Sequence, residues 1–170
     1  AFQSAPVADL GFAQVDLHRA LRKGFPEVIF GAGKTPAQVV QIATKLAAHE
    51  QNVLITRVTS EHVRALKRKF KNAKHHETAR CVTIAKKPLP KRTGTIAVIC
   101  AGTSDLPVAE EAAVTAEIMG NSVVRISDAG VAGLHRILSQ LEILQTANVL
   151  VVVAGMEGAL PSVVAGLVSK

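Results

Sequence analysis

The stretch TIAVICAGTSDLPVAEEAAVTAEIMGNSVVRIS at residues 95–127 decides the fold of the second half of the chain. An apolar run is followed by a turn of small residues, then by helical periodicity, then by a second apolar run. The alternation continues along the chain, and the expected elements are strands at 95–100, 122–127 and 148–155 and helices at 106–119, 132–145 and 158–168. Continuous apolar strands that alternate with helices predict a parallel sheet, covered on both faces and joined by right-handed crossovers.

The first half of the chain has the pattern of a smaller α/β unit. Strand-like runs are found at 27–30, 52–58 and 79–85, and helical periodicity at 36–49 and 61–71. The segment KKPLPKRTG at 86–94 contains two prolines, a glycine and four basic residues without apolar periodicity, which is typical of a linker. We therefore expect an N-terminal α/β domain with a basic linker at 1–92. A three-layer parallel-sheet domain of the Rossmann or flavodoxin-like kind should follow at 93–170.

The positive charge of the chain is concentrated in two runs. The formal net charge is +7, and the excess lies in RALKRKFKNAKHH at 64–76 and in KKPLPKR at 86–92. The chain has no Trp or Tyr, so it lacks the aromatic platforms that bind single-stranded nucleic acid, and we expect no nucleic-acid partner. The first run is interpreted as the solvated face of a helix whose Val63, Leu66 and Phe70 point inward. The alternative is a counter-charge for an anionic substrate or for acidic neighbours in an oligomer.

The sequence lacks the patterns of a membrane segment, a secretory signal and a cysteine metal site. No apolar stretch approaches the roughly 18 to 20 residues that span a bilayer, so we expect no membrane segment. The first sixteen residues do not have the pattern of a secretory signal, so we expect a cytoplasmic protein. Cys81 and Cys100 lie in strand-like runs without metal-type spacing, and both are expected to be buried thiols without a disulfide.

Three loops follow the strands of the predicted sheet, and ligands bind at this edge in such folds. In the first loop, Gly102 allows close backbone approach, while Thr103, Ser104 and Asp105 can hold an anion or a ribose. Simple capping of the next helix, with Pro107 in its first turn, explains the same residues equally well.

The other two loops carry titratable side chains. Asp128 either caps the next helix or joins a site with His135 and Arg136, and His135 is a candidate catalytic residue as well as a candidate structural histidine. Glu157 lies between two glycines directly after an apolar strand, where we expect a desolvated carboxylate that acts as general base or ligand holder. Its alternative role is to bind the first-turn amides of the last helix.

Two tempting motifs do not satisfy their patterns. GAGKT at 31–35 lacks the first glycine of a P-loop because Val28 occupies that position, and Pro36 occupies the third glycine position of a dinucleotide fingerprint. Lys34 and a helix N-terminus at Pro36 still suit weak phosphate binding. The sequence HHE at 75–77 is not predicted to bind a metal, because adjacent strand residues point to opposite faces.

Four motifs in order, GFPEVIFGAGKT, AGTSDLPVAEEAA, DAGVAGLHR and AGMEGALPSVVAGLV, resemble the LarB family of nickel-pincer nucleotide cofactor biosynthesis. The second half also resembles the broader PurE-like family. The resemblance implies carboxylation of the pyridinium ring of nicotinic acid adenine dinucleotide at C5, then hydrolysis that releases AMP and leaves pyridinium-3,5-biscarboxylate mononucleotide. It further implies carbon dioxide or bicarbonate as co-substrate, Mg²⁺ as a candidate for the hydrolytic step, and a homo-oligomer, specifically an octamer.

The resemblance also assigns roles to residues. Glu157, Asp105 and His135 are the implied catalytic residues. The implied substrate-binding residues are Gly102, Thr103, Ser104, Asp128, Arg136, Gly155, Met156 and Gly158, together with Arg19, Arg22, Glu27 and Lys34 from the first domain. The family's nucleophilic cysteine belongs to a C-terminal segment that neither Cys81 nor Cys100 matches, so we expect residues 93–170 to be a C-terminally incomplete PurE-like domain.

Two other functions compete with this one. A PurE-type carboxylase or mutase of aminoimidazole ribonucleotide expects Gly-Ser before the Ser-Asp pair and an Ala-His-Leu-Pro-Gly turn, whereas this chain has AGTSD and GALPS. The other alternative is a non-catalytic nucleotide-binding or assembly subunit. Retained dinucleotide binding without AMP release or carbon dioxide fixation would favour that alternative.

Overall fold

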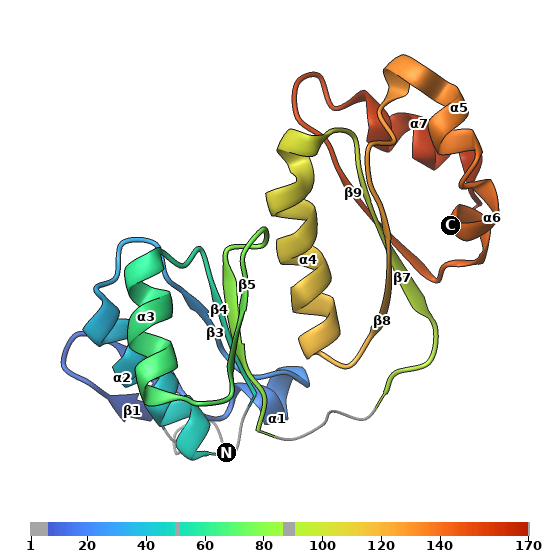
Figure 1. Cartoon of the computed structure of the whole chain (residues 1–170). Helices are drawn as coiled ribbons and strands as arrows, with labels where there is room; N and C mark the ends of the chain where they lie inside the picture. The colour runs from blue at the N-terminus through green and yellow to red at the C-terminus, as the bar shows by residue number, and fades with distance from the viewer. Residues whose placement is uncertain (1–6, 50–51, 87–90, 170) are drawn as a thin grey trace. The chain divides into compact units, whose positions relative to one another are not determined.

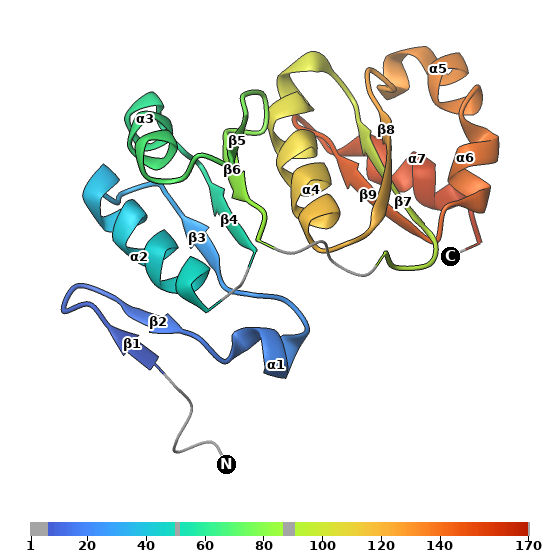
Figure 2. The same ribbon diagram turned by 60° about the horizontal axis from the view of Figure 1, so that its bottom comes forward.

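A computed structural model describes residues 7–49, 52–86 and 91–169 of the chain. The chain divides into two compact units, Ala1–Leu89 and Pro90–Lys170. Figures 1 and 2 show the elements of both units from two directions. Residues 87–90 of the predicted linker lie outside the described residues.

The second unit is built on three parallel strands in the order β8-β7-β9. The strands are β7 (Thr95–Cys100), β8 (Ser122–Ile126) and β9 (Val149–Val153). The helices are α4 (Leu106–Ile118), α5 (Leu134–Leu138), α6 (Leu141–Thr146) and α7 (Ala159–Leu167), and the 3-10 turns η1 (Thr103–Asp105) and η2 (Val131–Gly133) precede α4 and α5. The predicted α/β fold with a parallel sheet is therefore confirmed.

Each face of this sheet has its own core. Successive residues of β7 point to opposite faces, so Ala97 and Ile99 pack with buried residues of α5, α6 and α7, whereas Val98 and Cys100 pack against α4. Figure 1 shows α4 on one face of the sheet and the other three helices on the opposite face. Both faces are covered, which explains why the strand is apolar at nearly every position.

The strand order fixes where a ligand can bind. The chain leaves β7 through α4 to reach β8, and then returns past β7 through α5 and α6 to reach β9. Right-handed crossovers that run in opposite directions must lie on opposite faces, which accounts for the placement of the helices. The direction reverses between β7 and β9, so a crevice opens at the carboxyl ends of these two neighbouring strands.

The first unit contains a four-stranded mixed sheet in the order β3-β4-β6-β5 and a two-stranded antiparallel hairpin. The sheet strands are β3 (Val28–Phe30), β4 (Val53–Thr56), β5 (Ala73–His76) and β6 (Cys81–Ile84), of which β3 and β4 are parallel. The hairpin strands are β1 (Val7–Asp9) and β2 (Gln14–Asp16), and the helices are α1 (Arg19–Lys23), α2 (Pro36–Ala48) and α3 (Ser60–Lys69).

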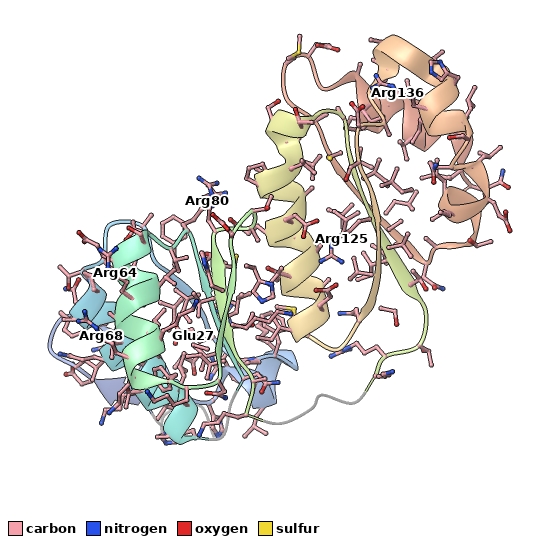
Figure 3. All side chains as sticks on the ribbon, in the orientation of Figure 1. Glu27, Arg64, Arg68, Arg80, Arg125 and Arg136 are labelled. Carbon is pink, nitrogen blue, oxygen red and sulfur yellow. The ribbon has the colours of Figure 1, made fainter. Side chains whose placement is uncertain are left out.

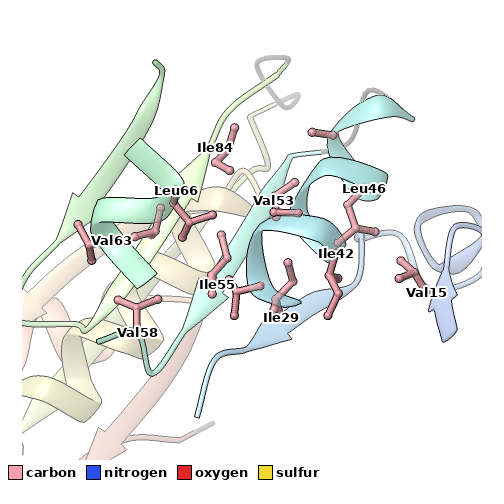
Figure 4. Packing of buried hydrophobic residues seen from close by; sticks show 14 residues of the cluster. Val15, Ile29, Ile42, Leu46, Val53, Ile55, Val58, Val63, Leu66 and Ile84 are labelled. Atoms are coloured by element: carbon pink, nitrogen blue, oxygen red, sulfur yellow. The ribbon is translucent and has the colours of Figure 1, made fainter. Parts of the chain in front are cut away.

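The core of the first unit lies between its sheet and the helices α2 and α3. Ile55 and Val82 are paired in register and belong to the same buried cluster as Leu46 of α2 and Leu66 of α3 (Figure 4). The prediction for 61–71 is confirmed, because Val63 and Leu66 are buried and Phe70 packs against them. Both predicted cysteine environments are also confirmed, since the two side chains are buried and not joined by a disulfide.

Capping explains where the two long helices of the first unit begin. Thr35 accepts a hydrogen bond from the Gln38 N–H before α2, and Thr59 accepts one from the His62 N–H before α3. The His62 Nε2 atom also lies 2.8 Å from the carbonyl oxygen of Lys34, which ties the 31–35 loop to α3. Within the described residues, no helix is long and apolar enough to cross a membrane.

Several predicted boundaries differ from the structure for identifiable reasons. The helix expected over 132–145 is wrong as one element: it is interrupted after Leu138, where the Ser139 hydroxyl donates to the Arg136 carbonyl. The strand expected over 52–58 ends at Thr56, because Arg57 has a left-handed φ of 53°. The elements β1, β2 and α1 were not predicted, since their sequences VAD, QVD and RALRK are short and, unlike VIF of β3, not continuously apolar.

Candidate functional site

A cavity of about 360 Å³ opens at the carboxyl edge of the parallel sheet in the second unit. All three loops that follow β7, β8 and β9 line it, as the position of the crevice requires. The lining residues include eight of the predicted site residues, namely Gly102, Ser104, Asp105, Asp128, Arg136, Gly155, Met156 and Glu157.

Asp105 joins the loop after β7 to the loop after β9. Its Oδ2 atom accepts a hydrogen bond of 2.9 Å from the Gly102 N–H, so the carboxylate folds back over its own loop. Although Asp105 stands at the N-cap position of α4, its side chain caps no α4 amide. Its Oδ1 atom faces Gly155, where an added Cβ would lie only 3.4 Å away. The backbone of the β9 loop therefore lies beside the carboxylate at a distance that leaves room for van der Waals contact.

Asp128 and Arg136 form an ion pair at the same cavity. Arg136 Nη1 donates to Asp128 Oδ1 at 2.8 Å, and Nη2 donates to the Gly130 carbonyl at 3.2 Å. Asp128 has a left-handed φ of 55°, which is uncommon for a residue other than glycine. The Asp128 side chain binds Arg136, and this contact differs from the alternative in which Asp128 merely caps the next helix.

The loop after β9 carries Met156 and Glu157 at the mouth of the cavity. The Gly158 N–H donates to the Gly155 carbonyl at 3.0 Å, which closes a tight turn around the two side chains. Met156 has a φ of 56° and is fully exposed. Glu157 is exposed as well, so the expected desolvation of its carboxylate is wrong for this unit: the turn carries it past the end of β9 into solvent.

Three predicted residues of the second unit do not line the cavity, and they are Thr103, His135 and Gly158. Thr103 lies exposed in η1, and Gly158 stands at the N-cap of α7. His135 is exposed on α5, and its ring lies beside Gly133 as the Arg136 guanidinium does: a Cβ added to Gly133 would be 3.0 Å from His135 Cε1 and 3.1 Å from Arg136 Nε. A catalytic role for His135 stays a prediction without support from the arrangement of the cavity.

The predicted residues of the first unit bind neighbouring side chains or the backbone of their own unit. Arg22 forms an ion pair with Asp16, whose backbone N–H donates to Glu27 at 2.8 Å. The hydrogen bond from Arg22 holds the pKa of the Asp16 carboxyl below its usual value, with a further contribution from the His18 N–H against the opposing effect of desolvation. Arg19 lies over the Phe25 ring, with its Cζ 5.4 Å from the ring centroid.

Lys34 is separated from those residues by a strand. Glu27 precedes β3 and Lys34 follows it, so the two lie at opposite ends of the strand. The Lys34 ammonium donates to the Phe30 carbonyl at 2.9 Å. The four first-unit residues therefore do not form one cluster, although Arg22 and Glu27 meet at Asp16.

The cavity has a defined chemical character. Asp105, Asp128 and Glu157 supply three carboxylates and Arg136 supplies one guanidinium, while the remaining lining is small or apolar. Such a site can hold a cationic ring beside carboxylates, bind a ligand carboxylate through the arginine, and accept a proton. Sequence reasoning missed the contribution of Gly130, whose carbonyl positions Arg136, and the small-residue run DAGVAG was the available signal.

The fold and the cavity together define an α/β protein with a carboxylate-lined cavity at a strand-order reversal. Residues 7–87 match the family described as LarB/PurE-like N-terminal domain. The first unit is therefore a LarB/PurE-like N-terminal domain. It is 37% identical over 163 residues to the uncharacterized protein MJ0165 of Methanocaldococcus jannaschii, in an alignment that covers 91% of this chain and 64% of that protein. The chain thus spans less than two thirds of the length of this relative.

Proposed function

We propose that the protein carboxylates the pyridinium ring of nicotinic acid adenine dinucleotide at C5 and hydrolyses its phosphoanhydride. The products are AMP and pyridinium-3,5-biscarboxylic acid mononucleotide, a precursor of the nickel-pincer nucleotide. The match of residues 7–87 to the LarB/PurE-like N-terminal domain supports a carboxylase-type reaction. The observation that carries the proposal is the cavity at the β7 and β9 ends, which is lined by Asp105, Glu157 and Arg136.

The cavity offers side chains for the steps of the proposed reaction. Dinucleotide, carbon dioxide and water give the dicarboxylated mononucleotide, AMP and protons. One proton leaves C5 as the new carbon–carbon bond forms, and the others come from hydrolysis of the phosphoanhydride. Among the described residues no side chain pairs with Glu157, so its carboxylate is available to accept that proton. Asp105, fixed by the Gly102 N–H, is suited to orient the cationic ring.

The ring needs a nucleophile before it can be carboxylated, because a pyridinium is electron-poor and does not attack carbon dioxide. Cys81 and Cys100 are 0% and 1% exposed, so neither thiol can reach a ligand in this cavity. An added small thiol can supply the nucleophile by adding to the ring and leaving afterwards unchanged. The test of the proposal is therefore made both with and without such a thiol.

The proposal also includes Mg²⁺ for the hydrolytic step and assembly into a homo-oligomer. No group of three or more metal-ligating side chains comes together within the described ranges, so this part of the chain offers Mg²⁺ no cage of its own. A homo-oligomer, an octamer by the resemblance, is measured by light scattering on the same sample.

The test is incubation of the chain with nicotinic acid adenine dinucleotide and isotopically labelled bicarbonate, with and without Mg²⁺ and a small thiol. Mass spectrometry should find AMP and a labelled dicarboxylated mononucleotide in equal amounts. Label incorporation without AMP would restrict the activity to carboxylation. Dinucleotide binding without either product would contradict the proposal and favour a non-catalytic binding subunit, and turnover of an aminoimidazole ribonucleotide instead would favour the PurE-type reaction.

A further inference from the structure

Arg136 is the only cation among the described residues that line the cavity of the second unit. Its side chain comes from α5 (Figure 3) and lies against the loop after β8. Three carboxylates line the same cavity, on Asp105, Asp128 and Glu157. A ligand carboxylate that enters is therefore repelled by most of the charged lining and attracted at one point alone.

The guanidinium of Arg136 is held in place before any ligand arrives. It donates to Asp128 and to the Gly130 carbonyl, which fixes two of its nitrogen atoms. Gly133 makes room for it, since an added Cβ at that position would lie 3.1 Å from Nε. A preordered arginine loses little conformational freedom when it binds a ligand, so its contribution to affinity is larger than that of a free surface arginine.

The guanidinium keeps unused donors that a carboxylate can accept. Arginine has five N–H donors, and the two described bonds use two of them. The side chain is still 35% exposed, so the remaining donors are open to a ligand. A carboxylate offers two oxygen acceptors to the planar fork, whereas a carboxamide offers one acceptor and one NH₂ donor that opposes the arginine.

We infer that Arg136 is a specificity-determining residue that makes this cavity select a pyridine ring bearing a carboxylate over the same ring bearing a carboxamide. The inference rests on the proposed function and names the group that separates the acid dinucleotide from its amide counterpart. Without Arg136, the carboxylates that remain around the cavity reverse the preference, because they repel the acid and tolerate the neutral amide.

The experiment measures binding of nicotinic acid adenine dinucleotide and of nicotinamide adenine dinucleotide to the full chain by calorimetry. The two ligands differ only in the ring substituent. The wild-type chain should bind the acid about tenfold to a hundredfold more tightly, which is the range of a charge-assisted pair. In Arg136→Gln the preference should vanish or reverse. In Arg136→Lys, which keeps the charge but lacks the fork, an intermediate preference should remain.

Arg92→Gln is the matched control, because it removes one positive charge at the other end of the sheet, before β7. It should keep the wild-type preference. Equal affinities in the wild-type chain, or an unchanged preference in a folded Arg136→Gln, would overturn the inference while leaving the proposed function intact. If neither dinucleotide binds the wild-type chain, the proposed function fails and the inference fails with it.

Discussion

Gly31→Ala should destabilise the first unit more than any other single methyl group added in the loop 31–35. Gly31 is buried directly after β3, and its N–H donates to the Thr56 carbonyl at 2.8 Å. An added Cβ would lie 2.8 Å from that same carbonyl oxygen and 3.1 Å from the carbonyl oxygen of Arg57. Both obstacles are backbone atoms, so no side-chain rotation can relieve the contact.

The size of the effect follows from these contacts. Overpacking a buried site costs about 1 to 3 kcal/mol, and the weakened hydrogen bond adds about 1 kcal/mol. The expected loss in the free energy of unfolding is therefore about 2 to 4 kcal/mol, a large part of the ~5 to 15 kcal/mol that stabilises a typical domain. Gly33→Ala is the control, since its φ of 77° costs an alanine about 1 to 2 kcal/mol while nothing lies within 4 Å of the new Cβ.

The assay is urea unfolding followed by far-ultraviolet circular dichroism, because the chain has no Trp or Tyr to report by fluorescence. Hydrogen exchange with peptide-level mass spectrometry then locates the change. Peptides of β3 and β4 should exchange faster in Gly31→Ala, whereas peptides of β7 and β8 in the other unit should not change. If Gly31→Ala costs no more than Gly33→Ala, the reasoning from close backbone approach is refuted.

Three further predictions concern charged side chains. The Arg22 hydrogen bond lowers the pKa of Asp16 below its ordinary 3.8, so Arg22→Gln should be less stable than the wild-type chain above pH 4. This loss of stability should shrink as acid protonates Asp16. A loss that does not depend on pH in thermal melts would contradict the prediction. Glu157→Gln should abolish carboxylation but keep dinucleotide binding measurable, and unchanged turnover would exclude Glu157 as the proton acceptor. Arg125 joins β8 to α4, and its pKa is raised mainly by the hydrogen bond to Glu117 and further by that to Glu110. Arg125→Gln should lower the free energy of unfolding by up to about 1 kcal/mol in low salt and by less in 1 M salt. Urea titration at both salt concentrations measures this difference.

The parts of the fold that could be predicted from sequence are those with long periodic patterns. The strand at 95–100 and the helix after it were predicted within a residue, because an apolar run and a thirteen-residue helix each carry many independent signals. The break after Leu138 was not predicted, since Ile137, Leu138 and Leu141 continue the apolar spacing across it. The break is seen in the Ser139 hydrogen bond and in the non-helical backbone of Gln140, where φ is −101° and ψ is 9°.

The candidate site was predictable in its location but not in its contacts. Parallel strands place their carboxyl ends together, so the three loops could be assigned to one cavity from their order alone. The pairing of Asp128 with Arg136 depends on a left-handed residue and on two glycines that leave room for a guanidinium, and a one-dimensional pattern does not encode that combination. The exposure of Glu157 likewise depends on how far a turn extends beyond its strand, which residue types alone do not determine.

Each of the two buried thiols reports how often the structure around it opens. Cys81 is the single cysteine of the first unit and Cys100 is the single cysteine of the second, and a thiol-specific reagent reaches each one only when its surroundings open. The uptake of reagent by the native chain therefore follows two rates, one for each unit. Without any introduced label, a ligand that binds in the cavity beside Asp105 should slow the modification of Cys100 and leave the rate at Cys81 as a built-in reference.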